Sequence, residues 1–218
     1  MGRTVIESHE VVFDPDNDLR PVGDQVLIKG IKNEKTVGGI ILPKGEKASS
    51  FVGEVVGVGN GFLSHRTGTL FQLAVRVGDY VVTMDYMGQH LDINGHKYRL
   101  VREHGIWAIL EVRHREGGFE IDKVTPYNGH ILVRPLVTEK SEGGIFLPSD
   151  PKVMYQRCEI VSVGHGYRDM ESGEIHQVEV SVGEKAVMRR YAGSQLTVKR
   201  EELRLIDRQD ILFVMEEE

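Results

Sequence analysis

The chain has 218 residues, 40% of them hydrophobic and 28% charged, a composition typical of globular proteins and too hydrophobic for a disordered chain. A formal net charge of −6 leaves no large basic face for a run of phosphates, so nucleic acid is not expected as a partner. No apolar run approaches the ~18 residues of a membrane-spanning helix. The N-terminal residues also lack the apolar stretch of a secretory signal, and we therefore expect a cytoplasmic protein with no membrane partner.

Glycine and cysteine carry further information. The 25 glycines exceed the usual share of about 7%, and this excess predicts many tight turns between short strands. The single cysteine, Cys158, excludes an intrachain disulfide and a metal site built from several thiolates. Because Cys158 lies within a strand-like run, we expect a small buried side chain rather than a reactive thiol.

Short strand-like runs recur along the chain. Residues 1–18 are expected to form an N-terminal extension, in which Val11-Val12-Phe13 is the strand-like run. No segment of a dozen residues keeps a 3.6-residue apolar period, so the predicted fold is all-β, built from small barrels of antiparallel strands. The predicted strands, each rich in β-branched residues, are 25–29, 54–59, 80–83, 98–101, 107–110, 130–134, 159–164, 185–188, 203–206 and 212–215.

One hexapeptide appears twice. Gly38-Gly39-Ile40-Ile41-Leu42-Pro43 returns 105 residues later as Gly143-Gly144-Ile145-Phe146-Leu147-Pro148. The same offset relates features far outside the hexapeptide, such as Val77-Gly78 and Val182-Gly183, with no net insertion. The chain is therefore a duplication of a unit of about a hundred residues, a size that can bury its own core.

The duplication predicts the domain organisation. After the extension at 1–18, a first barrel is expected at 19–113 and a second at 124–218. The charged, glycine-broken stretch 114–123 is expected to be the linker between them.

Each predicted unit contains a long polar stretch around its hexapeptide, at 30–50 and at 135–156. Loops of this length are usually functional or mobile. The apolar triplet could alternatively be a buried strand, but its repetition inside polar loops favours an exposed anchor for a partner. The candidate anchors are Ile40, Ile41, Leu42, Ile145, Phe146 and Leu147, and the candidate hinges are Gly38, Gly39, Gly143 and Gly144.

A second polar stretch between predicted strands follows Gly59 in the first unit and Gly164 in the second. Turn residues stand at both ends of the stretches 60–68 and 165–173. Each stretch is therefore predicted to be a hairpin that projects from its barrel.

The sequence offers little for catalysis. The glycine-rich run 57–61 is not followed by a helix that could offer its N-terminal amides to a phosphate. Few of the nine histidines recur at the offset, and there is no Gly-x-Ser-x-Gly elbow. We therefore expect no enzymatic activity, no metal site and no cofactor.

Four motifs in the first unit, in the same order along the chain, resemble a GroES-type co-chaperonin. They are Arg20-Pro21-Val22-Gly23-Asp24-Gln25-Val26, the hexapeptide, the run 53–61 and Val75-Arg76-Val77-Gly78-Asp79. The second unit resembles the family less closely. It has Thr125-Pro126-Tyr127 where the family has Arg-Pro-Leu, and Gly129 where the family has aspartate.

The resemblance implies two GroES-like irregular β-barrels in tandem, each with a mobile loop and a roof hairpin. It implies a homo-oligomeric ring that caps the chamber of a GroEL-type chaperonin and helps client proteins to fold inside it. The six anchors would bind the chaperonin, and ATP would be used by that partner rather than by this chain.

Several alternatives stay open at this stage. A scaffolding protein could keep both barrels without binding a chaperonin, and the divergence of the second unit suits that role. The barrel of a zinc-dependent alcohol dehydrogenase would require a nucleotide-binding domain and zinc ligands, which this chain lacks. Rings of the family contain seven units, whereas three two-unit chains supply six units and four chains supply eight. The number of chains in a ring is therefore open. A plastid or the cytoplasm of a virus-infected host is also open as the location.

Overall fold

The computed structural model describes residues 20–31, 50–93, 95–115, 118–136, 154–169 and 171–216, together with the backbone of 2–6 and 9–13. Every regular element in these ranges is a strand, apart from the single 3₁₀ turns η1 (Glu103–Gly105) and η2 (Arg208–Asp210). The all-β prediction is confirmed. In this part of the chain no helix is long and apolar enough to cross a bilayer.

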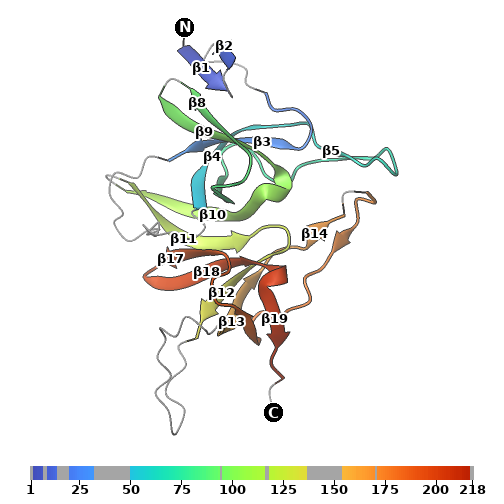
Figure 1. Cartoon of the computed structure of the whole chain (residues 1–218), viewed down its shortest axis with the longest axis vertical. Coiled ribbons are helices and arrows are strands. Elements are labelled where there is room, and N and C mark those ends of the chain that lie inside the picture. The colour runs from blue at the N-terminus through green and yellow to red at the C-terminus, as the bar shows by residue number, and fades with distance from the viewer. Residues whose placement is uncertain are drawn as a thin grey trace.

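Two large antiparallel sheets lie one after the other along the length of the molecule (Figure 1). The first has the strand order β11-β10-β7-β4-β3-β9-β8. Its strands are β3 (Gln25–Gly30), β4 (Ser50–Val58), β7 (Tyr80–Met84), β8 (Gln89–Ile93), β9 (His96–Arg102), β10 (Ile106–Arg115) and β11 (Gly118–Pro126).

The second sheet repeats the first. Its order, β19-β16-β13-β12-β18-β17, matches β10-β7-β4-β3-β9-β8 strand for strand at the 105-residue offset. Its strands are β12 (His130–Pro135), β13 (Tyr155–Val163), β16 (Lys185–Arg189), β17 (Ser194–Val198), β18 (Glu201–Asp207) and β19 (Ile211–Val214). The duplication inferred from the sequence is therefore present in the topology.

Three two-stranded hairpins complete the fold. β1 (Gly2–Ile6) pairs with β2 (His9–Phe13), so the strand-like run Val11-Val12-Phe13 of the extension pairs with the neighbouring strand in the sequence. β5 (Phe62–Leu63) pairs with β6 (Leu70–Phe71), and β14 (Tyr167–Arg168) pairs with β15 (Ile175–His176). These last two hairpins lie where the sequence predicts them, and both project to the same side of the molecule (Figure 1).

The sheets differ in one strand, β11. It comes from the start of the second unit but pairs with β10 of the first, from Ala108 opposite Pro126 to Arg115 opposite Gly118. The stretch 114–123 thus contains parts of two paired strands. The domain boundaries themselves stay a prediction.

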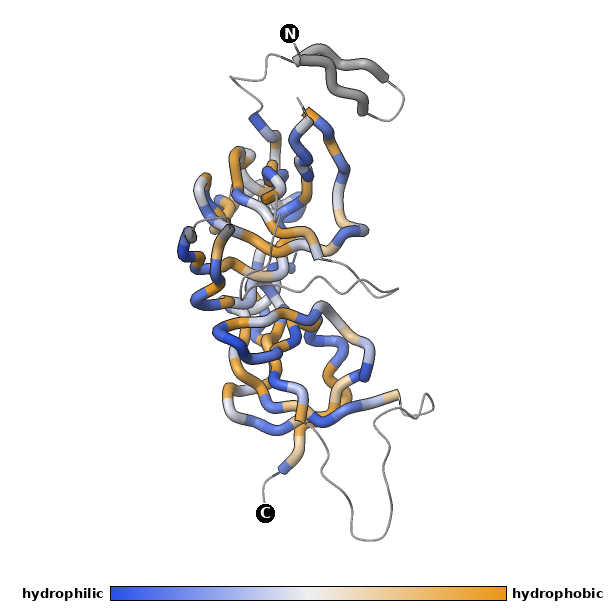
Figure 2. Tube along the Cα trace, turned by 90° about the vertical axis from the view of Figure 1, so that its left-hand side faces the viewer, coloured by the Kyte–Doolittle hydropathy of each residue, from blue (hydrophilic) through white to orange (hydrophobic). Residues whose placement is uncertain are grey.

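Each sheet encloses a core of its own. Val26, Ile28 and Val55 are buried in the first core, and their counterparts Ile131, Val133 and Ile160 are buried in the second. Strands alternate between hydrophobic and hydrophilic residues along much of the trace (Figure 2), as expected when one face of a sheet is buried.

A third core joins the two units. Trp107, Leu110 and Ile121 from the first sheet are buried in one cluster with Leu196 and Leu205 from the second. Because this cluster draws on both sheets, the units are held together by packing as well as by the covalent connection.

Candidate functional site

The structure fixes the ends of both predicted loops. β3 and β4 pair as antiparallel neighbours, with Gly30 opposite Gly53, so the two ends of the first loop lie side by side. β12 and β13 hold the second loop in the same way, with Pro135 opposite Cys158. The six predicted anchors and four hinge glycines lie outside the described residues, and their roles stay predictions.

The base of the first loop lies at the junction between the units. Ser50, the first residue of β4, is 4% exposed and accepts a hydrogen bond from the Ser194 hydroxyl of β17 at 3.1 Å. Gly30 packs against the Phe51 ring, where an added β-carbon would come within 2.8 Å of the ring. The second unit therefore supports this loop base directly.

The base of the second loop lies away from the junction. Arg134 on β12 bonds to Glu159 at 2.6 Å and also to Glu201, which ties β12 to both neighbouring strands. Met154 and Tyr155, at the far end of the loop, are 63% and 61% exposed. Tyr155 is the counterpart of the buried Ser50, so the two loops have different surroundings.

The two projecting hairpins contact each other. The Ser64 hydroxyl donates a hydrogen bond to the Glu171 carbonyl at 2.5 Å. The Arg168 guanidinium lies 4.7 Å from the centre of the Phe71 ring, a distance suited to a cation–π contact. These contacts join the hairpins of the two units into one surface.

The best-defined polar contact between the units involves Tyr127 and Glu103. The Tyr127 hydroxyl donates to a Glu103 carboxylate oxygen at 2.5 Å, and the same oxygen accepts from the Ala74 amide at 2.8 Å. Burial and the nearby Glu103 carboxylate raise the pKa of Tyr127 well above its usual value, so this hydroxyl stays protonated and donates. The Tyr127 amide also donates to the Trp107 carbonyl.

His130 reinforces the same junction. Its ring stacks on Trp107 with a centroid distance of 4.2 Å, and its Nδ1 donates to the Tyr127 carbonyl at 2.8 Å. Burial lowers the pKa of His130. The hydrogen bond to the Tyr127 carbonyl and the charge of the Asp207 carboxylate raise this pKa again, but by less than burial lowers it. The neutral ring is therefore the form that fits the junction.

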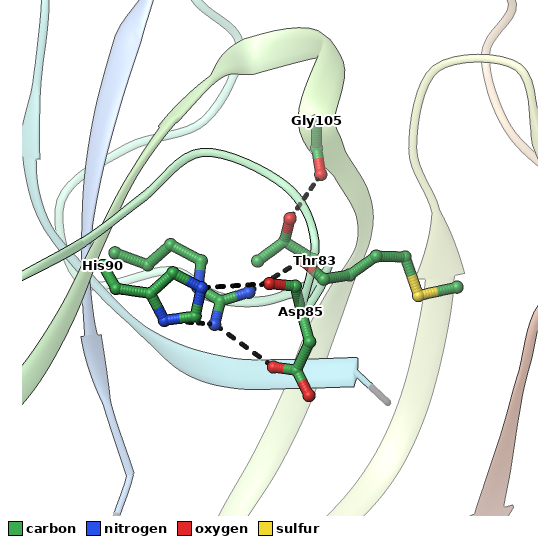
Figure 3. Close-up of polar contacts among 6 residues, drawn as sticks. Thr83, Asp85, His90 and Gly105 are labelled. Carbon is green, nitrogen blue, oxygen red and sulfur yellow. Dashed lines mark hydrogen bonds and ion pairs between the residues drawn. The ribbon is translucent and has the colours of Figure 1, made fainter. Parts of the chain in front are cut away.

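A buried arginine stabilises the turn after β7 (Figure 3). Arg99 is 2% exposed, donates to the Met84 carbonyl at 2.7 Å and pairs with Asp85 at 3.2 Å. Its guanidinium also lies 3.2 Å from His90 Nδ1 and 4.4 Å from the centre of the Phe51 ring. Arg99 thus links this turn to the strand that follows the first loop.

Nothing in the described part of the chain has the geometry of a metal centre, because no group of three or more His, Cys, Asp or Glu side chains converges there. Cys158 is fully buried, as predicted, and burial raises the pKa of its thiol to about 11.

A pocket of about 180 Å³ opens at the junction between the units. It is lined by acidic Asp24, Glu103 and Asp207 and by basic Arg168 and Arg208. Its mixed charge favours no one class of ligand.

Sequence reasoning missed the junction, although a signal for it was present. Tyr127 and Gly129, like Thr125, are positions at which the second unit departs from the co-chaperonin pattern. Tyr127 makes the contact with Glu103, and Gly129 leaves room for Arg208, whose Cδ would lie 3.2 Å from an added β-carbon. Tyr127 therefore places one of these departures at the contact with the first unit, whereas Gly129 lies against Arg208 and Tyr167 of its own unit.

Comparison with known proteins identifies the family of each half. Residues 18–110 and 123–215 both match the family described as "Chaperonin 10 Kd subunit". The chain is 30% identical to the chloroplastic 20 kDa chaperonin of Arabidopsis thaliana over 200 residues, covering 90% of this chain and 75% of the relative. The spinach protein of the same name is 30% identical over 193 residues, covering 87% and 72%. Co-chaperonin GroES of Parabacteroides distasonis is 38% identical over 94 residues, covering 43% of this chain and 99% of the relative.

Proposed function

Because the chain belongs to the chaperonin 10 kDa subunit family, with one family unit in each half, we propose that it assembles into a ring-shaped lid on a GroEL-type chaperonin. The family is one of non-enzymatic co-chaperonins. The lid would close a chamber in which client proteins fold, and the partner would use the ATP. We propose a cytoplasmic location, although the double-unit relatives carry chloroplastic names.

One observation supports this function above the others. Two predicted loops with closely similar apolar triplets are each held at the base by a pair of antiparallel strands. We propose that Ile40, Ile41 and Leu42, and likewise Ile145, Phe146 and Leu147, bind apolar grooves on the chaperonin. The glycine pairs before them would act as hinges.

The energies suit a reversible lid. Burying three large apolar side chains yields roughly 1.5–3 kcal/mol each, whereas fixing flexible backbone costs about 1–2 kcal/mol per residue. One loop alone would therefore bind weakly. The core shared by the units fixes the two loop bases relative to each other, so the second loop would bind at a high effective concentration.

The divergence of the second unit no longer favours a scaffold without a chaperonin partner. Tyr127 is accounted for by its contact with Glu103 of the first unit, and Gly129 by the room it leaves for Arg208 within its own unit. The second hexapeptide keeps its glycine pair, its three apolar residues and its proline. We therefore propose that both loops bind.

Limited proteolysis tests this function. The free chain should be cut near Ile40 and Phe146, and a GroEL-type chaperonin with nucleotide should protect both places. Ile41→Asp should leave the first loop open to cleavage even when the chaperonin is present. It should also weaken binding of the chain to the chaperonin at least about tenfold, because an unpaired charge would enter an apolar groove. Val182→Asp, a change at a 66% exposed residue outside the loops, is the matched control. Protection at neither loop would contradict the proposal.

A further inference from the structure

The base of the first loop contains a stack of Gly30, Phe51 and Arg99, the loop-base stack. Gly30 is the last residue of β3 and Phe51 the second of β4, so they lie on opposite sides of the loop. An added β-carbon at Gly30 would come within 2.8 Å of the Phe51 ring, so the absent side chain leaves room for this ring. The Arg99 guanidinium lies 4.4 Å from the ring centre. Phe51 therefore contacts the other end of the loop and a buried cation at the same time.

Hydrogen bonds fix the position of Arg99. Its guanidinium donates to the Met84 carbonyl at 2.7 Å, to the Asp85 carboxylate at 3.2 Å and to His90 Nδ1 at 3.2 Å (Figure 3). His90 in turn donates from Nε2 to the Asp85 carbonyl at 3.1 Å. In the sheet, β4 and β3 lie between β7, which ends at Met84, and β9, which carries Arg99. A planar guanidinium bonded in several directions has little freedom, so it also restricts the ring of Phe51.

The base of the second loop is built differently. Arg204, the counterpart of Arg99, donates to the Arg190 carbonyl. Its surroundings then diverge, because a cation stands in place of the carboxylate and an amide in place of the aromatic ring. The counterparts of Asp85, His90, Phe51 and Gly30 are Arg190, Gln195, Gln156 and Pro135. These residues cannot form the same stack.

We propose that Arg99 is a positioning residue, which holds the base of the first loop in place through the ring of Phe51. The second loop starts from a base without this stack, so the two loops are unequal despite their similar triplets. A loop that leaves the barrel from a fixed base loses less freedom on binding. The first loop should therefore contribute more than the second to binding a GroEL-type chaperonin, a step that rests on the proposed function.

Two backbone amides report on the two bases separately. The Ile31 amide donates to the Val52 carbonyl at 3.3 Å. At the 105-residue offset the Leu136 amide donates to the Arg157 carbonyl at 2.9 Å. Both bonds join the strands at the base of a loop. Hydrogen exchange of the full chain without chaperonin, followed by mass spectrometry at single-amide resolution, therefore compares the two bases within one molecule.

Arg99→Met gives the first test, because it keeps a long side chain but removes the guanidinium. Exchange of the Ile31 amide should become at least about tenfold faster, as expected for the loss of a desolvated cation–π contact, while the Leu136 amide should stay within about twofold of the wild type. Arg102→Met makes the same substitution on the same strand, at a side chain that is 62% exposed, and should change neither amide. An unchanged Ile31 amide, or equal acceleration of both amides, in Arg99→Met would overturn the inference.

A double-mutant cycle tests whether Arg99 acts through Phe51. Phe51→Leu leaves the hydrogen bonds of Arg99 in place and should also speed exchange at Ile31. Combining it with Arg99→Met should add little, because both changes break the same stack. Fully additive effects would contradict the proposed link. If Arg99→Met does not fold, Arg99→Lys takes its place in the cycle, since an ammonium keeps the charge but loses the planar fork.

Chaperonin binding tests the ranking of the loops. With a GroEL-type chaperonin and nucleotide, Ile41→Asp should raise the dissociation constant at least about threefold more than Phe146→Asp. In the Arg99→Met background the two substitutions should have equal effects, because the advantage of the first base is gone. Equal effects in the otherwise wild-type chain would show that the ranking is wrong.

This inference and the proposed function can fail separately. If a chaperonin protects both loops but Arg99→Met leaves the Ile31 amide unchanged, the positioning role is wrong and the lid function stands. If Arg99→Met speeds exchange at Ile31 alone but no chaperonin protects either loop, the positioning role stands and the lid function is wrong.

Discussion

At the level of single residues, the contact between Tyr127 and Glu103 is the clearest adaptation to the tandem arrangement. Tyr127→Phe removes the hydroxyl and leaves the Glu103 oxygen bonded to the Ala74 amide alone. The free energy of unfolding should fall by about 1.5–3 kcal/mol, the range for a hydrogen bond to a charged group. Urea titration measures the change. Tyr86→Phe, at a residue that is 67% exposed, should change stability by less than about 0.5 kcal/mol, and an equal loss in both variants would contradict this account.

His130 should make stability depend on pH. Burial lowers its pKa in the folded chain, so below the ordinary histidine pKa of about 6.5 the unfolded chain binds the proton first. The contribution is fully present above that pH, and it is lost as the pH falls towards the folded pKa. The slope from one proton is at most about 1.4 kcal/mol per pH unit.

The measurement is the free energy of unfolding between pH 8 and pH 5. His130→Gln, which restores the residue type of its counterpart Gln25, should flatten the dependence. Burial also lowers the pKa of His165, so a smaller slope should remain. His96→Gln, at an exposed residue, should leave the wild-type curve unchanged, and a His130→Gln curve as steep as that of the wild type would contradict the prediction.

At the level of elements, Gly193 shows why certain turns between strands require glycine. Its φ is +67°, and an added β-carbon would collide with the Leu205 carbonyl oxygen on β18. Gly193→Ala should therefore destabilise the fold by more than the roughly 1–2 kcal/mol of left-handed backbone strain. Gly183→Ala is the matched control, because Gly183 has φ +94° but no atom within 4 Å of an added β-carbon. If both variants lost the same free energy of unfolding in urea titrations, the collision with the Leu205 carbonyl oxygen would have no effect on stability.

The elements also show what the sequence could and could not predict. Strands such as 25–29 and 130–134 were predictable because each is a short apolar run bounded by turn residues. The offset predicted two sibling units, and the structure has two sheets whose strand orders match apart from β11. The pairing of β10 with β11 was not predictable, since the charges and glycines around His114 and Gly118 are typical of a linker. Backbone pairing there depends on tertiary context rather than on local composition.

The candidate site also has a part that the sequence predicts and a part that it does not. The apolar triplets are conspicuous because they repeat inside polar loops, but which groove they fill depends on a partner that the sequence does not contain. Contacts such as Ser50 with Ser194 join residues far apart in the chain, and no local pattern indicates them. The anchor roles therefore stay predictions, whereas the loop bases are defined by the structure.

At the level of the whole molecule, the shared core should make the two units unfold together. Trp107, the single tryptophan, lies in this core beside His130, so its fluorescence reports on the junction while circular dichroism reports on both sheets. For the single chain the two signals should give one coincident urea transition. Leu205→Ala, which removes a fully buried side chain of the second sheet from the shared core, should cost about 2–5 kcal/mol and move both signals together. A circular dichroism transition in two steps, with the fluorescence change confined to one of them, would show instead that the units are independently stable and that the junction contributes little to the fold.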